Sequence, residues 1–102
     1  MDYSSITELN LSNKGLTKLP DLSLYTNLKN LNCTYNKITR LDNLTQTIIY
    51  LNCHNNQIAT LDNLPQTITV LYCLNNPLKY NFTPTLENIR KHNITQNNII
   101  KN

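Results

Sequence analysis

A segment of 20 residues repeats along this chain, and this period constrains the fold more than any other feature of the sequence. Residues 27–44 read NLKNLNCTYNKITRLDNL, residues 47–64 read TIIYLNCHNNQIATLDNL, and residues 67–81 read TITVLYCLNNPLKYN. Residues 6–27 fit the same frame less closely, at a distance of 22 residues. A unit this short cannot bury its apolar side chains alone, so the period predicts units stacked in a row.

Each unit contains a pattern that predicts a short β-strand. In the third unit, alternation sends Leu51 and Cys53 inward and Asn52 outward. The return path at residues 61–67 is too short for a helix and contains Pro65, so we expect it to run extended. Equivalent strands of successive units are then expected to pair in parallel, about 4.8 Å apart.

The apolar positions follow the order L-x-x-L-x-L-x-x-N/C-x-L, and over about three-quarters of its length the chain resembles the leucine-rich-repeat family. Its short repeats look similar to those of bacterial effector proteins, through LPDL at 19–22 and LDNLPQT at 61–67, and to those of large DNA viruses of amoebae. The resemblance implies an α/β repeat solenoid with short parallel strands on the concave side and extended segments on the convex side. It leaves function open, because this fold serves many unrelated roles.

The repeat frame predicts a single domain over residues 1–102. A C-terminal helix is expected over residues 83–92, with Thr83 as N-cap, Pro84 in the first position, and Leu86 and Ile89 facing the last repeat. The repeats themselves are expected at about residues 6–27, 28–47, 48–67 and 68–80, followed by a C-terminal cap at 81–102.

The first repeat has only Tyr3 and Ile6 to cover its exposed end, so we expect this end to be thinly protected. At the other end, the tail contains Ile94, Ile99 and Ile100, which pack on the helix or remain loose. An apolar tail and an unpaired edge strand near residues 6–11 both favour self-association. A self-assembling structural solenoid is therefore the alternative function.

Nearly one residue in five is asparagine, and the repeat frame divides these residues into two groups. One asparagine per unit is expected to turn inward after the strand and to bond backbone groups of adjacent loops through both its donor and its acceptor. Lys14 occupies this position in the first unit. The other asparagines, among them Asn10, Asn32 and Asn52, are interpreted as surface decoration. The inward group comprises Asn36, Asn56 and Asn76.

The three cysteines replace an inward leucine of the strand, so Cys33, Cys53 and Cys73 are expected to lie one above another in the core. A buried apolar thiol has a raised pKa and is inert. No Cys-x-x-Cys pair supplies a ligand set, so a structural role is favoured over a metal or redox role. We expect no metal site.

The outward positions of the strands and of the following loops become more apolar along the chain. The first unit is polar there, whereas later units carry exposed aromatic residues, which commonly anchor protein interfaces. The predicted partner-binding residues on the concave face are Tyr35, Tyr50, His54, Val70, Tyr72 and Leu74.

Composition and charge exclude several classes of function. A single glycine, Gly15, rules out a P-loop and a dinucleotide fingerprint, and no cofactor is expected. The net charge is only +3, and the cations Lys18 and Arg40 are interspersed with Asp21 and Asp42, which argues against nucleic-acid binding. No nucleophile accompanies either histidine, so no catalytic residues are assigned and the protein is not expected to be an enzyme.

No stretch of the sequence is long and apolar enough to span a membrane, and the first residues do not resemble a secretion signal. The expected location is the cytoplasm, which is that of a host cell if the protein is viral or an effector. The sequence thus predicts a non-catalytic module that binds a protein partner through its concave face. If the protein is viral or an effector, that partner is a host protein.

Overall fold

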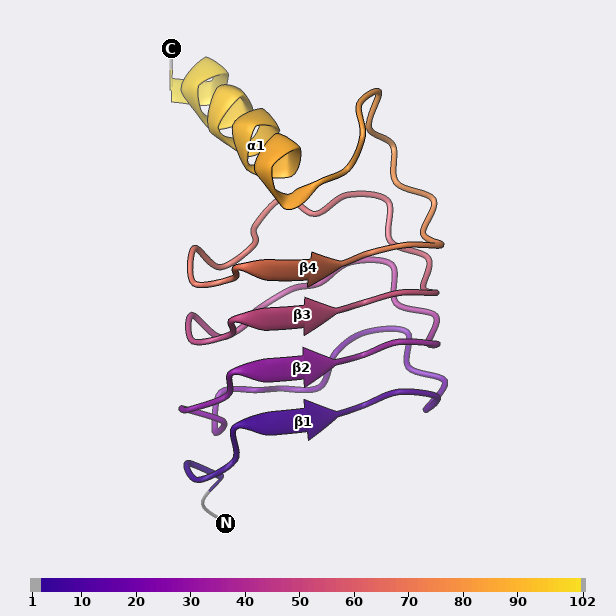
Figure 1. Cartoon of the computed structure of the whole chain (residues 1–102), viewed down its shortest axis with the longest axis vertical. Coiled ribbons are helices and arrows are strands. Elements are labelled where there is room, and N and C mark those ends of the chain that lie inside the picture. The colour runs from indigo at the N-terminus through magenta and orange to yellow at the C-terminus, as the bar shows by residue number, and fades with distance from the viewer. Residues whose placement is uncertain (1–2, 102) are drawn as a thin grey trace.

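The computed structural model describes residues 3–101, and the side chains of residues 3–96 among them. It contains four strands of three residues each and one helix: β1 (Glu8–Asn10), β2 (Asn30–Asn32), β3 (Tyr50–Asn52), β4 (Val70–Tyr72) and α1 (Leu86–Lys101). The strands form one parallel sheet in the order β1-β2-β3-β4 (Figure 1). The predicted parallel pairing and α/β repeat arrangement are confirmed.

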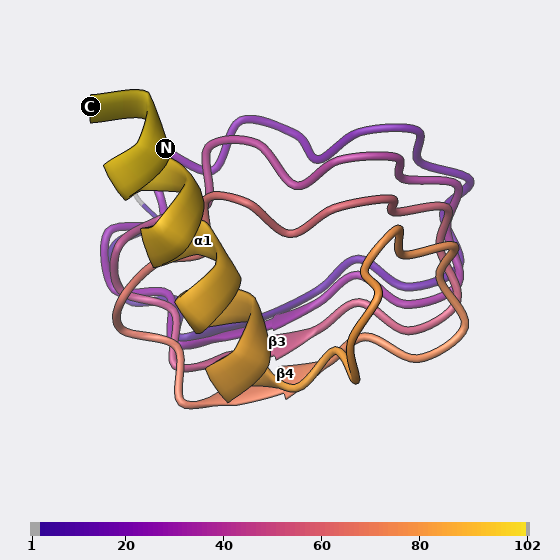
Figure 2. The same ribbon diagram turned by 90° about the horizontal axis from the view of Figure 1, so that it is seen from above.

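The strands pair in the register that the 20-residue alignment predicts. Leu9 lies opposite Leu31, Leu31 opposite Leu51, and Leu51 opposite Leu71. Seen from above, the segments that connect successive strands follow one another closely on the side of the molecule opposite the sheet (Figure 2). Equivalent residues of the units therefore form columns along the sheet.

The core lies between the sheet and the connecting segments. The central residues of β2 and β3, Leu31 and Leu51, are fully buried, and Leu28, Ile48 and Ile68 form a second buried column just before the strands. The flanking strand residues point away from this core. We define the outer sheet face as the surface formed by these flanking side chains and by the outward-pointing side chains among the three residues that follow each strand.

The inward asparagines bond the backbone as predicted. The Oδ1 atom of Asn56 accepts the N–H of Ile38 at 3.1 Å, and its Nδ2 donates to the carbonyls of Cys33 at 2.9 Å, Cys53 at 3.1 Å and His54 at 3.3 Å. Each such side chain therefore joins its own unit to the unit before it. Asn36 and Asn76 make the equivalent bonds.

The interpretation of the other asparagines as surface decoration is wrong for two further columns. The Oδ1 atoms of Asn10, Asn32 and Asn52 each accept the backbone N–H two residues ahead, which holds the turn after the strand. A second column adopts left-handed backbone angles, which asparagine tolerates better than most residues. It contains Asn13, Asn55 and Asn75, with φ of 56°, 61° and 59°.

The C-terminal helix exists, but its predicted limits are wrong. It begins at Leu86 because Thr85, and not Thr83, caps it: Thr85 Oγ1 accepts the N–H of Asn88 at 3.1 Å. The carbonyl of Thr83 instead accepts the N–H of Thr85, which forms a turn before the helix. The helix continues to Lys101 because no glycine or proline interrupts the tail.

Residues of α1 seal the last unit, and the helix lies across this end of the molecule (Figure 2). Ile89 is fully buried and Leu86 packs against the core, as predicted. Arg90 was not anticipated in this role: its guanidinium donates to the carbonyls of Ile68 at 2.6 Å, Pro65 at 3.1 Å and Gln66 at 3.2 Å. Ile94 is exposed, and the side chains of Ile99 and Ile100 lie outside the described part of the chain.

A ring cluster also joins the last unit to the helix. The rings of Tyr80 and Phe82 stack with centroids 4.7 Å apart, and His92 of α1 meets Tyr80 at 5.3 Å. The Tyr80 hydroxyl accepts the N–H of Leu61 at 2.7 Å. This cluster was absent from the sequence prediction.

The N-terminal end is covered more thinly, as predicted. Tyr3 is half-buried and stacks on Tyr25 with centroids 4.8 Å apart. Leu9 and Leu11 are only half-buried, whereas Leu31 and Cys33, their counterparts in the next unit, are fully buried. The two ends therefore differ in how well they close the core.

Replacing Asn56 by alanine should lower the free energy of unfolding by about 2–4 kcal/mol, because it removes the acceptor of the buried Ile38 N–H and one donor from each of the carbonyls of Cys33, Cys53 and His54. Urea denaturation followed by circular dichroism measures this loss. The control is Asn63→Ala at an exposed position, with an expected change within about 0.5 kcal/mol. Equal losses in the two variants would contradict the bonding role.

Candidate binding surface

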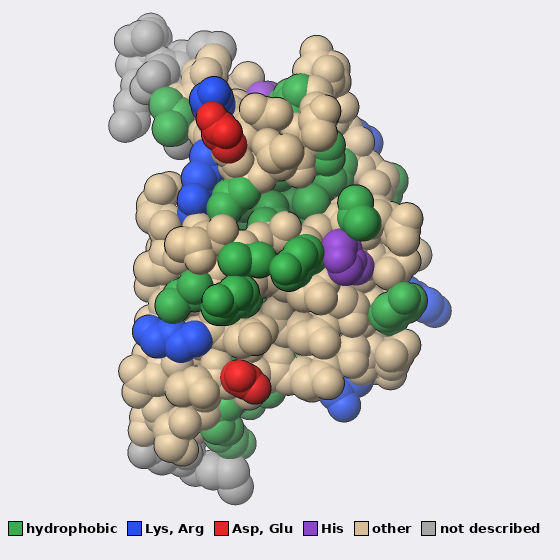
Figure 3. Space-filling view, viewed as in Figure 1, with side chains coloured by type: hydrophobic (Ala, Val, Ile, Leu, Met, Phe, Trp, Pro, Cys, Tyr) green, Lys and Arg blue, Asp and Glu red, His purple; other side chains and the backbone are tan. Residues whose placement is uncertain are grey.

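The predicted partner-binding residues all lie on the outer sheet face, and four of them are well exposed. The exposed fractions are 48% for Tyr50, 50% for Tyr72, 57% for Tyr35 and 68% for Leu74. Val70 and His54 are half-buried beside them. Hydrophobic side chains gather in a band over β3 and β4 next to a histidine, whereas the surface over β1 is mostly polar (Figure 3).

His54 ties parts of this surface together. Its Nδ1 atom accepts the N–H of Leu74 at 2.7 Å, and its ring lies 5.6 Å from the ring of Tyr72. Its carbonyl accepts the N–H of Tyr35 at 3.1 Å. Because Nδ1 is an acceptor in this arrangement, the neutral imidazole carries its proton on Nε2. His54 thus holds three of the other predicted residues in place.

Tyr35 occupies a backbone conformation that suits asparagine. Its φ is 56°, and the equivalent residues of the other units, Asn13, Asn55 and Asn75, have the same left-handed conformation. A bulky residue pays about 1 kcal/mol for these angles, and such strain is often found at functional sites. Tyr35 is the one aromatic residue in a column of asparagines. The aligned sequence already shows this exception, which marks Tyr35 as unusual.

The three cysteines lie where the repeat frame predicts them. Cys33, Cys53 and Cys73 are free and buried. Burial raises the pKa of the Cys33 thiol to about 12 and raises the pKa values of Cys53 and Cys73. The thiols are therefore protonated and shielded at neutral pH, which makes them fillers of the core and poor nucleophiles.

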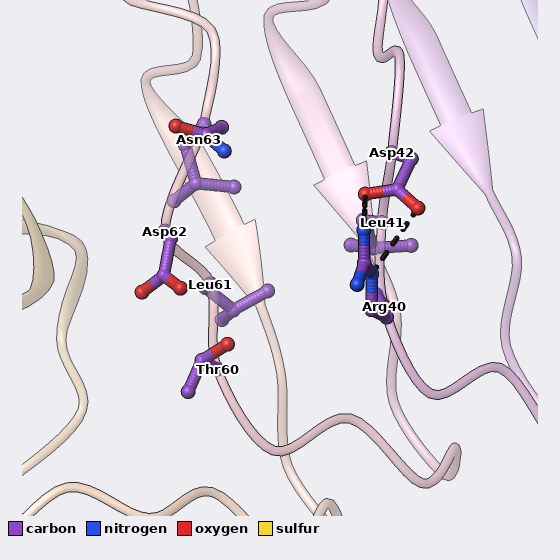
Figure 4. Close-up of a pocket in the computed structure, with 8 residues that line it drawn as sticks. Arg40, Leu41, Asp42, Thr60, Leu61, Asp62 and Asn63 are labelled. Atoms are coloured by element: carbon purple, nitrogen blue, oxygen red, sulfur yellow. Dashed lines mark hydrogen bonds and ion pairs between the residues drawn. The ribbon is translucent and has the colours of Figure 1, made fainter.

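A shallow hollow lies on the connecting segments, away from the outer sheet face (Figure 4). Its volume is about 210 Å³, and its walls include Arg40, Asp42, Thr60 and Asp62. The guanidinium of Arg40 donates to both carboxylate oxygens of Asp42 at 3.2 Å, so the cation is already paired. Within residues 3–101, no group of three histidine, cysteine or acidic side chains could hold a metal ion.

Comparison with known proteins assigns no relative. No protein-family model matches the chain, nor does any curated protein or solved structure. In the part of the chain that the structure describes, no helix has the length and apolar character needed to cross a membrane.

Replacing Tyr35 by asparagine should raise the free energy of unfolding by about 0.5–1 kcal/mol, because asparagine adopts the left-handed conformation at lower cost. The reciprocal variant, Asn13→Tyr, places a ring at the equivalent position and should lower stability by a similar amount. Urea denaturation measures both. If Tyr35→Asn were instead less stable than the wild type, the contacts of the tyrosine ring would stabilise the fold by more than the left-handed backbone conformation destabilises it.

Proposed function

We propose that the chain is a leucine-rich-repeat solenoid that binds a protein partner through the outer sheet face, which is its concave side, and performs no catalysis. The in-register columns, the three-residue parallel strands and the asparagine bonds between units support this assignment. Connecting segments without helix or strand in the described chain agree with the extended convex side of such repeats.

The observation that carries the proposal is the exposure of three tyrosines on one face. Tyr35, Tyr50 and Tyr72 each expose about half of their surface, and Leu74 exposes more. Tyrosine buries a large apolar ring on binding and keeps a polar tip for hydrogen bonds, at a low cost in side-chain entropy. The backbone strain at Tyr35 supports the same role, because folding alone favours asparagine there.

The chemistry of the remaining groups agrees with a binding role. The Nδ1 atom of His54 is bonded to a backbone N–H, so it offers no free base on that side. The thiols are buried and unpaired, which suits a reducing compartment such as the cytoplasm, the location that we propose. The partner is accordingly a protein of that compartment.

Capture from a cell lysate by the immobilised chain, with quantitative mass spectrometry, tests the binding face. We expect a set of proteins whose recovery falls at least tenfold with Tyr50→Ser/Tyr72→Ser, because the variant removes two half-exposed rings. The matched control is Leu24→Ser, which removes a large side chain that is 57% exposed on the segment between β1 and β2. Equal recovery by the double variant and the wild type would exclude this face.

Self-assembly through a terminal edge is the second candidate function. It is favoured because β1 is an edge strand whose outward backbone groups can pair with another chain. This strand is at the edge of the sheet. In the later units the N–H groups of Asn30, Tyr50 and Val70 donate to the preceding unit, so the equivalent N–H of Glu8 points away from β2. An edge with outward donors and a half-buried Leu9 can pair with a second copy.

Sedimentation velocity over a range of concentrations tests this candidate. If copies pair through β1, the wild type should form dimers and Glu8→Pro should remain monomeric, because proline removes the outward N–H without removing a bond to β2. Ile94→Lys is the control for association through the exposed tail. A wild type that is monomeric at the highest concentration reached would contradict self-assembly.

A further inference from the structure

We propose that His54 is a pH-sensitive positioning residue: as a neutral imidazole it holds the β4 end of the outer sheet face in place, and on protonation it releases that end. The contact involved is the hydrogen bond from the N–H of Leu74 to Nδ1 of His54, at 2.7 Å, which we call the His54–Leu74 bond. The effect of this bond on partner binding rests on the proposed function.

The fourth unit lacks the side chain that holds the turn after the strand in the other units. In the first three units the last strand residue is an asparagine, and its Oδ1 accepts the N–H two residues ahead. Tyr72 occupies this position in the fourth unit, and the ring atoms next to its Cβ are carbon. Nδ1 of His54, from the neighbouring turn, accepts the N–H of Leu74 instead. The asparagine bonds are Asn10 to Ser12 at 3.0 Å, Asn32 to Thr34 at 3.0 Å and Asn52 to His54 at 3.3 Å.

The His54–Leu74 bond requires a neutral imidazole. Nδ1 accepts through a lone pair, whereas a protonated imidazole carries an N–H donor on both nitrogens. Two donors would then face each other across the 2.7 Å that separates Nδ1 from the Leu74 nitrogen, so the ring and the turn must move apart. Histidine is the residue type that ordinarily changes charge between about pH 5 and 8, so acidification over this range breaks the bond.

Within the described residues, no carboxylate pairs with His54 to compensate an imidazolium. The ion pairs there join Arg40 to Asp42 and Lys91 to Glu87. Strands β2, β3 and β4 contain no charged residue, and the turns at residues 33–37, 53–57 and 73–77 contain Lys37 besides the histidine. Glu8 lies two strands away on β1, and Lys29 precedes β2 at the opposite end of the strands. The other titratable side chains of these segments are Tyr35, Tyr50, Tyr72, Cys33, Cys53 and Cys73.

Loss of the His54–Leu74 bond changes the surface and leaves the fold in place. The fourth turn keeps two other bonds to the third: the N–H of Asn55 donates to the carbonyl of Leu74 at 2.9 Å, and Nδ2 of Asn75 donates to Oδ1 of Asn55 at 3.0 Å. The released ring, whose centroid lies 5.6 Å from that of Tyr72, then carries a positive charge beside exposed apolar side chains. A partner that covers these side chains must desolvate this cation, so binding weakens.

NMR spectra of the isotope-labelled chain test the bond directly. At about pH 8 we expect the His54 tautomer with its proton on Nε2, and a scalar coupling between the Leu74 nitrogen and Nδ1 that only a hydrogen bond transmits. The coupling should vanish on titration to about pH 5, as the ring of His54 is protonated. His92, whose ring contacts Tyr80 and Phe82, is the reference for a histidine outside this turn. A coupling that is absent at the higher pH, or that persists at the lower one, would overturn the inference.

His54→Asn is the matched variant for the effect on binding. Its Oδ1 occupies the place of Nδ1 and accepts the Leu74 N–H without titrating. For the lysate proteins whose capture depends on Tyr50 and Tyr72, we expect wild-type recovery to fall about three- to tenfold between about pH 8 and pH 5, the usual effect of losing one hydrogen bond. The ratio of the two recoveries should be close to one for His54→Asn, which also controls for titration of the partner.

The outcomes separate this inference from the proposed function. If the coupling is lost on acidification but the wild type and His54→Asn show the same recovery ratio, the bond does not govern binding and that part is overturned. Stronger capture by the wild type at the lower pH would overturn it as well. If no protein depends on Tyr50 and Tyr72 for capture, the proposed function and the effect on binding both fail, while the coupling alone decides whether the bond is pH-sensitive.

Discussion

The fold depends on a primary amide that follows the strand in every unit after the first, as Asn36, Asn56 and Asn76. Strands of three residues form too few ladder bonds to hold the units together, and the turn after each strand buries backbone carbonyls and N–H groups that need partners. An amide supplies a donor pair and an acceptor from one short side chain, which neither a carboxylate nor a hydroxyl can do. Asn36, Asn56 and Asn76 meet this need and fix the register of the columns.

Most of this arrangement could be predicted from the sequence because period, strand alternation and amide chemistry point to the same register. The inward leucines, the buried cysteines and the three bonded asparagines follow from that agreement. The first residue of the helix could not be predicted, because Thr83 and Thr85 on either side of Pro84 are both plausible N-caps. The turn between them determines that Thr85 is the N-cap. The role of Arg90 did not follow either, because nothing in the sequence shows that carbonyls of residues 65–68 lie within reach of its guanidinium.

The candidate surface was predictable in position but not in character. The alternation rule placed Tyr50 and Tyr72 outward, and the structure exposes both. The strain at Tyr35 and the acceptor role of His54 depend on backbone angles and on the distance between adjacent loops. Neither quantity can be obtained from a single sequence without knowledge of the turn.

The same bonds that hold the turns also determine what the surface offers to a partner. Asn32, Asn52 and His54 each accept a backbone N–H, so these acceptor atoms serve the turns. The exposed hydroxyls of Tyr35, Tyr50 and Tyr72 can both donate and accept, so the surface still offers a partner both kinds of hydrogen-bonding group. Part of the polar chemistry of the face is therefore set by how short repeats satisfy their own backbone.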